Sequence, residues 1–175
     1  MTLYKNKYRI ESIRLPNRDY AANGYYFVTI CTYKKYCYLG NIINCEMQFS
    51  QVGKIANKNW QLIPEHCNDV YLDAYVIMPN HLHGIIVIDR PENSSNTPNK
   101  FAPLKSGSLS VIVQFYKASV TRWCRKNGDD IFRWQSRFYE HIIRDERALK
   151  NIRDYIINNP VKWWEDKHNP INIKN

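Results

Sequence analysis

Short apolar runs with strand character occupy the first half of the chain. Residues 25–33 follow a glycine and are rich in β-branched and aromatic side chains, which predicts a strand. Similar runs predict strands over 68–78 and 81–88, and a shorter one near 45–49. Pro79 separates the two longer runs. Because proline cannot donate to a sheet ladder, we expect a bend or a bulge there.

Apolar residues at helical spacing predict helices between and after these strands. Ser50, Ser108 and Asp145 can each cap one helix, because their side-chain oxygens can accept from the first free amides. Pro64 is expected to end the first helix, and Asn127-Gly128 the second. Pro160 disfavours helical geometry at the preceding residue, so the last helix should end near there.

These elements indicate an α+β fold. Strands and helices do not alternate as regular β-α-β units, so we expect a mainly antiparallel sheet. One domain is predicted over residues 25–164. A basic N-terminal arm over 1–24 precedes it, and a polar tail over 165–175 follows it. Residues 89–107 are rich in Pro, Asn and Ser and are expected to form a loop.

The charge balance points to a polyanionic partner. The chain has 25 Lys and Arg against 16 Asp and Glu, a net charge of +9. Such a balance favours nucleic acid, although charge alone specifies no sequence preference and no reaction. No apolar run approaches the roughly 20 residues that span a bilayer. The first residues lack the apolar core of a signal peptide, so we expect a cytoplasmic protein with no membrane contact.

Two histidines two residues apart are the first candidate site. His81 and His83 lie in an apolar strand-like run, where alternation puts both side chains on one face. Paired imidazoles on such a face suit a divalent metal, although packed and hydrogen-bonded core histidines are the commoner interpretation of the spacing alone. The five cysteines form no Cys-x-x-Cys pair and are expected to be reduced thiols. A metal would therefore have His and oxygen ligands, which favours Mg²⁺ or Mn²⁺.

A second constellation lies in the last predicted helix. Tyr155 and Asn159 are four residues apart, so they share one helix face. A tyrosine and an amide oxygen on that face could meet a metal held by the two histidines. Asn159 would then be the third ligand and Tyr155 a nucleophile. The chain has 13 tyrosines, however, and most tyrosines in proteins are amphipathic packing residues.

Four segments together resemble a known family. Residues 79–83 resemble the His-hydrophobe-His (HUH) motif of single-tyrosine transposases, and residues 109–117 resemble the helix that follows it. Residues 134–141 and 154–161 resemble the C-terminal signature of the REP-associated tyrosine transposases. The matches occur in the family's order and span about residues 25–164.

The resemblance implies a ferredoxin-like (RRM-like) core with helices packed on one face of the sheet and the HUH motif on a central strand. It implies that Tyr155 is the catalytic tyrosine and that His81, His83 and Asn159 hold the metal. The family cleaves and rejoins single-stranded DNA through a covalent 5′-phosphotyrosine and often recognises a neighbouring hairpin. The resemblance leaves open whether the chain acts as a monomer or a homodimer.

Basic and aromatic residues around these segments are candidate DNA contacts. Cations would neutralise phosphates and tryptophans could stack on unpaired bases, although solvated helix faces and core packing explain them equally well. His141, in the third segment, can be either a DNA contact or a packing residue. The candidates are Lys117, Arg122, Arg125, Arg133, Arg137, Arg144, Lys162, Trp134 and Trp163.

Two other functions fit parts of the sequence. A replication or nicking nuclease with an HUH motif would share the chemistry, but the short chain and the C-terminal signature favour a transposase. A non-catalytic module that binds single-stranded nucleic acid would fit a ferredoxin-like sheet, and it would form no covalent adduct and need no metal. A zinc nucleobase deaminase is disfavoured, because the histidine motif lacks its glutamate and no Pro-Cys-x-x-Cys follows.

Overall fold

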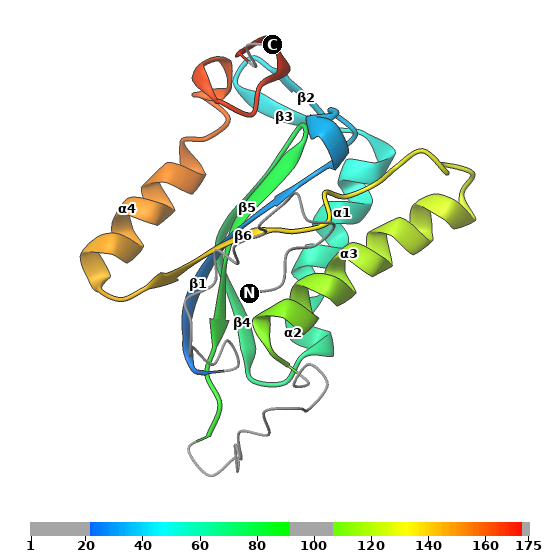
Figure 1. Cartoon of the computed structure of the whole chain (residues 1–175). Helices are drawn as coiled ribbons and strands as arrows, with labels where there is room; N and C mark the ends of the chain where they lie inside the picture. Colours follow the sequence, from blue (N-terminus) through cyan, green and yellow to red (C-terminus); the bar gives the residue numbers. More distant parts are fainter. Residues whose placement is uncertain (1–21, 92–106, 173–175) are drawn as a thin grey trace, which may run out of the picture.

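A four-stranded antiparallel sheet lies at the centre of the molecule (Figure 1). The computed structural model describes residues 22–91 and 107–172. Most of the expected N-terminal arm, most of the 89–107 loop and the end of the tail lie outside the described residues. The elements are β1 (Gly24–Cys31), η1 (Tyr33–Lys35), β2 (Gly40–Ile43), β3 (Glu46–Phe49), α1 (Gln51–Gln61), α2 (Ile63–His66), β4 (Val70–Met78), β5 (His81–Ile88), α3 (Leu109–Lys126), β6 (Tyr139–Ile143), α4 (Glu146–Ile157), η2 (Trp163–Glu165) and η3 (Pro170–Asn172).

The sheet has the expected ferredoxin-like topology. Its strands lie in the order β4-β5-β1-β6, and every neighbouring pair is antiparallel. The chain reaches them as β1–α1–β4–β5–α3–β6, so each helix crosses between strands that are not neighbours. β1 and β5 are the two central strands. The histidine motif begins β5, which confirms its expected place on a central strand.

α1 and α3 cover one face of this sheet. Tyr26, Val28 and Ile30 of β1 point to that face, where the α1 residue Trp60 is fully buried. Gly84 of β5 faces the same way, and a Cβ built on it would clash with the Trp60 ring at Cζ2. The indole can therefore pack against the central strand only because residue 84 has no side chain.

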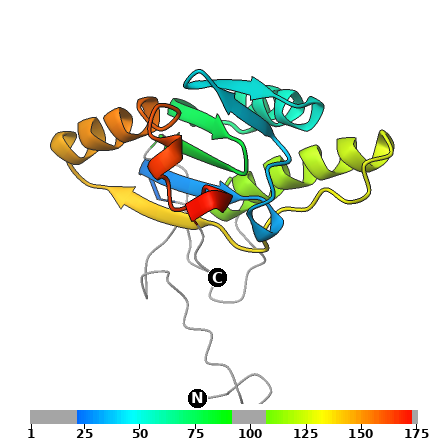
Figure 2. The ribbon, with the colours of Figure 1, turned by 90° about the horizontal axis from the view of Figure 1, so that it is seen from above.

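A further helix, α4, covers the opposite face of the sheet, in addition to the two helices of the ferredoxin-like core. Figure 2 shows α4 (orange) on the other side of the sheet from α3. Leu149 and Ile156 of α4 are buried against Phe27, Ile85 and Ile143 of the three neighbouring strands. Because side chains alternate along a strand, the face that receives α4 also carries His81 and His83. This arrangement decides where the site lies.

Local details depart from the sequence prediction in three places. Pro64 does not simply end a helix, because it lies in the first turn of the short helix α2, where a missing N–H costs nothing. The bend expected at Pro79 is present as the tight turn from β4 into β5, but the register also shifts between Leu72 and Tyr75, where no bulge was expected. Ser108 has N-cap backbone geometry, but its side chain caps no amide. By contrast, Ser50 and Asp145 accept from the Gly53 and Ala148 amides, as predicted.

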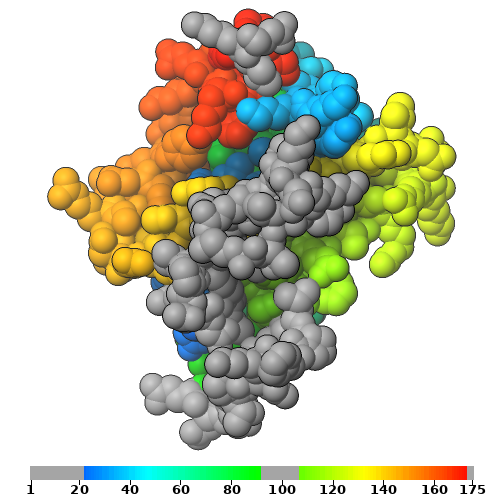
Figure 3. Space-filling model, in the orientation of Figure 1, coloured from blue at the N-terminus to red at the C-terminus, as the bar shows by residue number. Residues whose placement is uncertain are grey.

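The C-terminal residues form an ordered segment. Short 3-10 turns at η2 and η3 fold residues 163–172 back over the end of the sheet. Trp163 is buried with Ile42 and Met78, and Asn169 donates to the Trp163 carbonyl oxygen at 3.1 Å. In Figure 3 this segment (red) lies directly beside the light-blue segment that follows β1. Within residues 22–91 and 107–172, every helix is too short or too polar to cross a membrane.

Candidate active site

The two histidines lie side by side in the interior. His81 is 0% and His83 3% exposed, and their ring centroids are 4.6 Å apart. The residues between and after them, Leu82 and Gly84, point to the opposite face of β5. The predicted alternation is therefore confirmed, and both imidazoles face the layer that contains α4.

The side chain of Asn80 holds His81 in one tautomer. Asn80 is fully buried, and its amide nitrogen donates to the carbonyl oxygens of Lys35 and His168 at 2.9 and 2.7 Å. The Asn80 oxygen must therefore be the atom that lies 2.8 Å from His81 Nδ1, and this imidazole nitrogen donates to it. The lone pair of His81 is left on Nε2, which is buried without a hydrogen-bond partner among the described residues.

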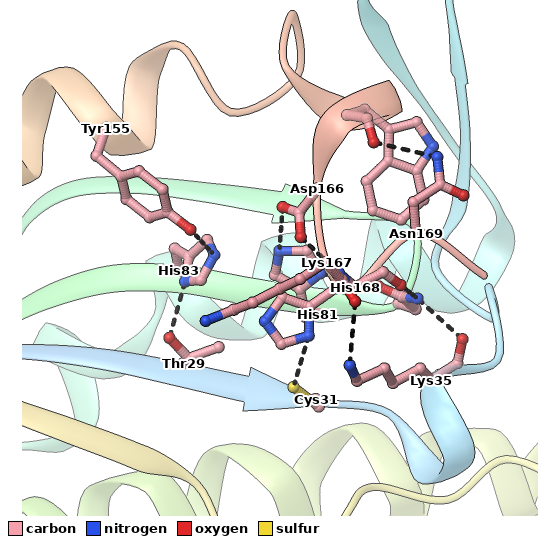
Figure 4. Close-up of polar contacts among 12 residues, drawn as sticks. Thr29, Cys31, Lys35, His81, His83, Tyr155, Asp166, Lys167, His168 and Asn169 are labelled. Carbon is pink, nitrogen blue, oxygen red and sulfur yellow. Dashed lines mark hydrogen bonds and ion pairs between the residues drawn. The ribbon is translucent and has the colours of Figure 1, made fainter. Parts of the chain in front are cut away.

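His83 lies between a threonine and the predicted nucleophile. Thr29 of β1 is the register partner of His83, and its hydroxyl lies 2.8 Å from His83 Nδ1. The Tyr155 hydroxyl lies 3.0 Å from His83 Nε2 (Figure 4). The tyrosine and the histidine are 72 residues apart in the sequence. The structure thus brings together the two constellations that the sequence had suggested separately.

α4 places the tyrosine through one apolar stripe and one ion pair. Ile156 is buried against the sheet, whereas the preceding Tyr155 is 44% exposed at the edge of the interface. Arg153 makes a bidentate pair with Asp73 of β4, with N–O distances of 2.9 and 2.6 Å. Asn159, one turn beyond Tyr155, is 3% exposed, and its Oδ1 has no hydrogen-bond partner among the described residues.

The C-terminal segment adds groups that the sequence prediction missed. Asp166 Oδ2 lies 3.9 Å from His81 Nε2, and the His168 ring centroid lies 4.6 Å from that of His81. Nitrogen or oxygen atoms of His81, His83 and Asp166 all lie within 4.8 Å of one another. This set of groups fits a divalent metal, because it has two neutral imidazoles and a carboxylate. Two buried atoms, His81 Nε2 and Asn159 Oδ1, also lack hydrogen-bond partners among the described residues.

Burial keeps both histidines neutral. It lowers the pKa of His81 well below its usual value, and the neighbouring His83 and His168 lower it further. Burial lowers the pKa of His83 to about 3, with smaller contributions from His168 and Lys167. An imidazole must be unprotonated to bind a metal, so both side chains are in the ligand form at neutral pH.

The pKa of Tyr155 is shifted in the opposite sense. Partial burial raises it, the nearby carboxylate of Asp166 raises it further, and the amide of Asn159 lowers it. A neutral hydroxyl is therefore the resting form of Tyr155, and a cation near the phenol oxygen would be needed to favour the phenolate.

A pocket of about 460 Å³ opens beside the tyrosine. Its wall includes Thr29, His83 and Tyr155 together with the basic residues Lys35, Arg137 and Lys167. The Lys35 amine donates to the Lys167 carbonyl oxygen at 3.3 Å, which ties the turn after β1 to the C-terminal segment. A pocket that combines a hydroxyl with three cations suits a phosphate group.

The other candidate DNA contacts are divided among several places. Arg144 and Lys162 are exposed near the ends of α4, away from the pocket lining. His141 is exposed on β6, opposite Phe27. Trp163 is 5% exposed, so its ring is a core residue in this structure and is not presented for stacking. The remaining candidates lie along one groove beside α3: Lys117, Arg122, Arg125, Arg133 and Trp134.

Three residues that lie beside the two histidines were not predicted from the sequence: Thr29, Asp166 and His168. Thr29 could not be found, because its pairing with β5 depends on long-range register. The sequence predicts only a polar tail over residues 165–175, which includes Asp166 and His168. The only sequence signal for them was an Asp and a His two residues apart shortly after a tryptophan pair.

Known proteins of similar sequence identify the family. An uncharacterized protein of Haemophilus influenzae is 43% identical over 163 residues, 89% of this chain and 91% of that protein. A second protein of that organism, assigned by name to the REP-associated tyrosine transposases, is 31% identical over 152 residues, 83% of this chain and 74% of its own length. This chain belongs to the REP-associated tyrosine transposase family.

Further comparisons agree with this family. A REP-associated tyrosine transposase of Escherichia coli is 31% identical over 91 residues, which cover 52% of this chain and 44% of that protein. The solved structure of a REP-associated tyrosine transposase bound to a REP hairpin superimposes with a TM-score of 0.60. It is 22% identical and covers 89% of this chain and 77% of that one, which supports the shared fold. No family model matches the chain.

Proposed function

We propose that this transposase cleaves and rejoins single-stranded DNA through a covalent bond between Tyr155 and a 5′-phosphate. The observation that carries the proposal is the 3.0 Å contact between the Tyr155 hydroxyl and His83 Nε2, at the rim of a pocket with three cations. A packing tyrosine would not need its oxygen beside two buried histidines. The hydroxyl is also partly exposed, so a flexible strand can reach it.

In the proposed step the Tyr155 oxygen attacks the scissile phosphorus. The bond from phosphorus to the 3′ oxygen breaks, the tyrosine loses its proton and the departing 3′ oxygen gains one. The products are a 5′-phosphotyrosine and a free 3′-hydroxyl. Rejoining is the reverse step with the 3′-hydroxyl of another strand, so the phosphoester energy is kept and no nucleotide cofactor is required.

His81 and His83 would hold Mg²⁺ or Mn²⁺, with oxygen donors from Asn159 and Asp166. His81 Nε2 and Asn159 Oδ1 are buried without partners among the described residues, and Asp166 lies beside His81. A bound divalent metal supplies positive charge that polarises the scissile phosphate. Asn80 and Thr29 fix the orientation of the two imidazoles through their Nδ1 atoms. Lys35, Arg137 and Lys167 would hold the phosphate in the pocket.

The substrate is proposed to be an unpaired strand next to a hairpin. Two observations support this proposal: the structural neighbour is bound to a REP hairpin, and this chain has a net charge of +9. Replication or nicking nucleases would share the chemistry but not the family membership. A non-catalytic binding module would not need Tyr155 beside the histidines.

The nucleophile is tested by trapping the adduct. Wild-type protein is incubated with 5′- and 3′-labelled single-stranded DNA and Mg²⁺ or Mn²⁺, and the products are separated on a denaturing gel. Tyr155→Phe should abolish the adduct. Tyr139→Phe, which changes another tyrosine of the same pocket, and Tyr71→Phe, which changes an exposed tyrosine of β4, should retain it. An adduct that persists in Tyr155→Phe and disappears in Tyr139→Phe would overturn the assignment.

The metal ligands are tested by binding, independently of activity. Titration calorimetry with Mn²⁺ should show one site in the wild type, and His81→Ala should remove it. Asn159→Ala and Asp166→Asn should each weaken it if both oxygens are ligands. A His81→Ala protein that binds Mn²⁺ as tightly as the wild type would refute the site.

A further inference from the structure

A second concave surface runs along α3, outside the catalytic pocket. It has a volume of about 880 Å³ and lies between α3 and residues 130–136. Figure 1 shows this segment (yellow) running back beside α3 (lime). Gln114, Lys117, Thr121 and Arg125 recur every three or four residues, so they line the groove from one helix face. The opposite face of α3 is buried in the core.

The second wall of the groove is held by β1 and by the turn that follows it. The backbone amide of Gln135 donates to the Cys31 carbonyl oxygen at 2.9 Å, and that of Tyr33 donates to the Arg133 carbonyl oxygen at 2.8 Å. The indole N–H of Trp134 crosses the groove floor to the Lys117 carbonyl oxygen at 3.2 Å. The groove is therefore preformed, and its far wall is fixed to the strand that supports His83 through Thr29.

Positive charge dominates this surface. Arg122, Arg125 and Arg133 are exposed, and none of them pairs with a carboxylate of the described residues. The Lys117 amine donates to the carbonyl oxygens of Gln135 and Ser136 at the inner end. Asp130 is the only acidic residue among those that line the groove. Four cations against one carboxylate suit a ligand with several negative charges at regular spacing.

The groove and the catalytic pocket share Gln135 in their walls. We propose that this groove, formed by α3 and residues 130–136, binds the phosphate backbone of the unpaired DNA strand whose scissile phosphate lies at Tyr155. The inference rests on the proposed function for the identity of that strand. The indole of Trp134 is half-buried and supplies an aromatic surface for an unpaired base, which favours a single strand over a duplex.

Charge removal in the groove tests the proposal. The triple variant Arg122→Gln, Arg125→Gln, Arg133→Gln is compared with a control that removes three exposed cations elsewhere, Lys126→Gln, Arg147→Gln, Lys150→Gln. Both are built on Tyr155→Phe, so that binding is measured without cleavage. The probe is a fluorescent 20-nucleotide single strand, and anisotropy gives the Kd over a series of salt concentrations. A duplex of the same sequence serves as the second probe.

The groove variant should bind the single strand about tenfold more weakly or worse than its parent. The slope of log K against log salt should fall by about 2, because each lost phosphate contact removes roughly 0.7. The control should stay within twofold of the parent. Equal losses in the two variants would overturn the proposal, since they would reflect net charge alone. A loss of affinity for the duplex without a loss for the single strand would also overturn it.

Adduct formation separates this proposal from the proposed function. The same groove triple with Tyr155 restored should still form the covalent adduct, but it should need a higher DNA concentration to do so, because the groove residues bind the strand and lie outside the reacting groups. Weak binding with an intact adduct supports the groove. Unchanged binding with an intact adduct refutes the groove and leaves the nucleophile assignment in place. No adduct in the wild type, with weak binding in the groove variant, refutes the function alone.

Discussion

The two halves of the candidate site are built in different ways. His81 and His83 lie on a central strand, and both have hydrogen-bond partners that the core holds in place. Tyr155 and Asp166 come from α4 and the C-terminal segment, which pack on one face and at one end of the ferredoxin-like core. The strand half, His81 and His83, is 0–3% exposed, whereas Tyr155 in the helix half is 44% exposed. Metal binding and nucleophilic attack should therefore respond to different substitutions.

This difference has a physical reason. Imidazoles that bind a metal must be neutral and rigid, and burial between two strands provides both properties. A DNA strand must be able to reach a nucleophile and stays bonded to it after the attack. The elements that hold the nucleophile must therefore leave one side of its side chain open to solvent. α4 meets this need with one apolar stripe and one ion pair, Arg153 to Asp73.

The largest expected effect concerns acid stability of the strand half. Burial lowers the pKa of His83 to about 3 in the folded protein and lowers that of His81 well below its usual value, whereas both imidazoles bind protons near pH 6.5 in the unfolded chain. Stability is therefore full above that pH and is lost as the pH falls below it. Between pH 7 and pH 5 we expect a loss of about 2 kcal/mol from His83 in metal-free protein, and a further loss in the same direction from His81.

Urea unfolding at a series of pH values in EDTA measures this loss. His83→Gln should make the pH dependence shallower, because one of the two groups is gone. A flat profile in the wild type would show that the histidines are not buried as neutral groups.

The next effect tests the packing under the histidines. Gly84→Ala would place a Cβ against Trp60 and should lower the free energy of unfolding by about 3 kcal/mol. Gly128→Ala is the matched control, because Gly128 has a positive φ of 80° but nothing within 4 Å of the added Cβ. It should cost only about 1 kcal/mol, from backbone strain alone. Similar losses in both variants would argue against close packing of Trp60 on β5.

A smaller effect separates metal affinity from the nucleophile. Thr29→Val removes the partner of His83 Nδ1 with almost no change in shape. Because a support of this kind is worth 10- to 100-fold in affinity for many metal sites, Mn²⁺ binding should weaken by about that factor. Thr29→Ser keeps the hydroxyl and should bind normally in calorimetry. Normal Mn²⁺ affinity in Thr29→Val would mean that Thr29 does not orient the imidazole.

The smallest effect concerns the helix half alone. Arg153→Gln breaks the bidentate pair with Asp73 and loosens α4 at the turn before Tyr155. We expect adduct formation to slow by roughly tenfold or less, while Mn²⁺ affinity and the urea midpoint change little. Lys150→Gln removes the exposed pair with Asp154, 4.0 Å long, and should change neither quantity. A loss of Mn²⁺ affinity in Arg153→Gln would show that the two halves are not independent.

Local patterns were enough for much of the core. The alternation in β5, the Ser50 and Asp145 caps and the end of α3 near Asn127-Gly128 all follow from neighbouring residues. The β2–β3 hairpin was only half predicted, because its first strand carries a weak pattern. Its two-residue turn, Asn44 and Cys45, has both residues at positive φ, which sequence alone signals poorly when glycine is absent.

Local periodicity alone places the two histidines on one strand face, and Tyr155 and Asn159 on one helix face. That these faces meet depends on the side of the sheet that α4 covers, which no local pattern specifies. The support of His83 by Thr29 likewise requires the β1–β5 register, which is a long-range property. Asp166 and His168 lie beside the histidines because Trp163 is buried against Ile42 and Met78. This packing joins segments that lie far apart in the chain, so no local pattern predicts it.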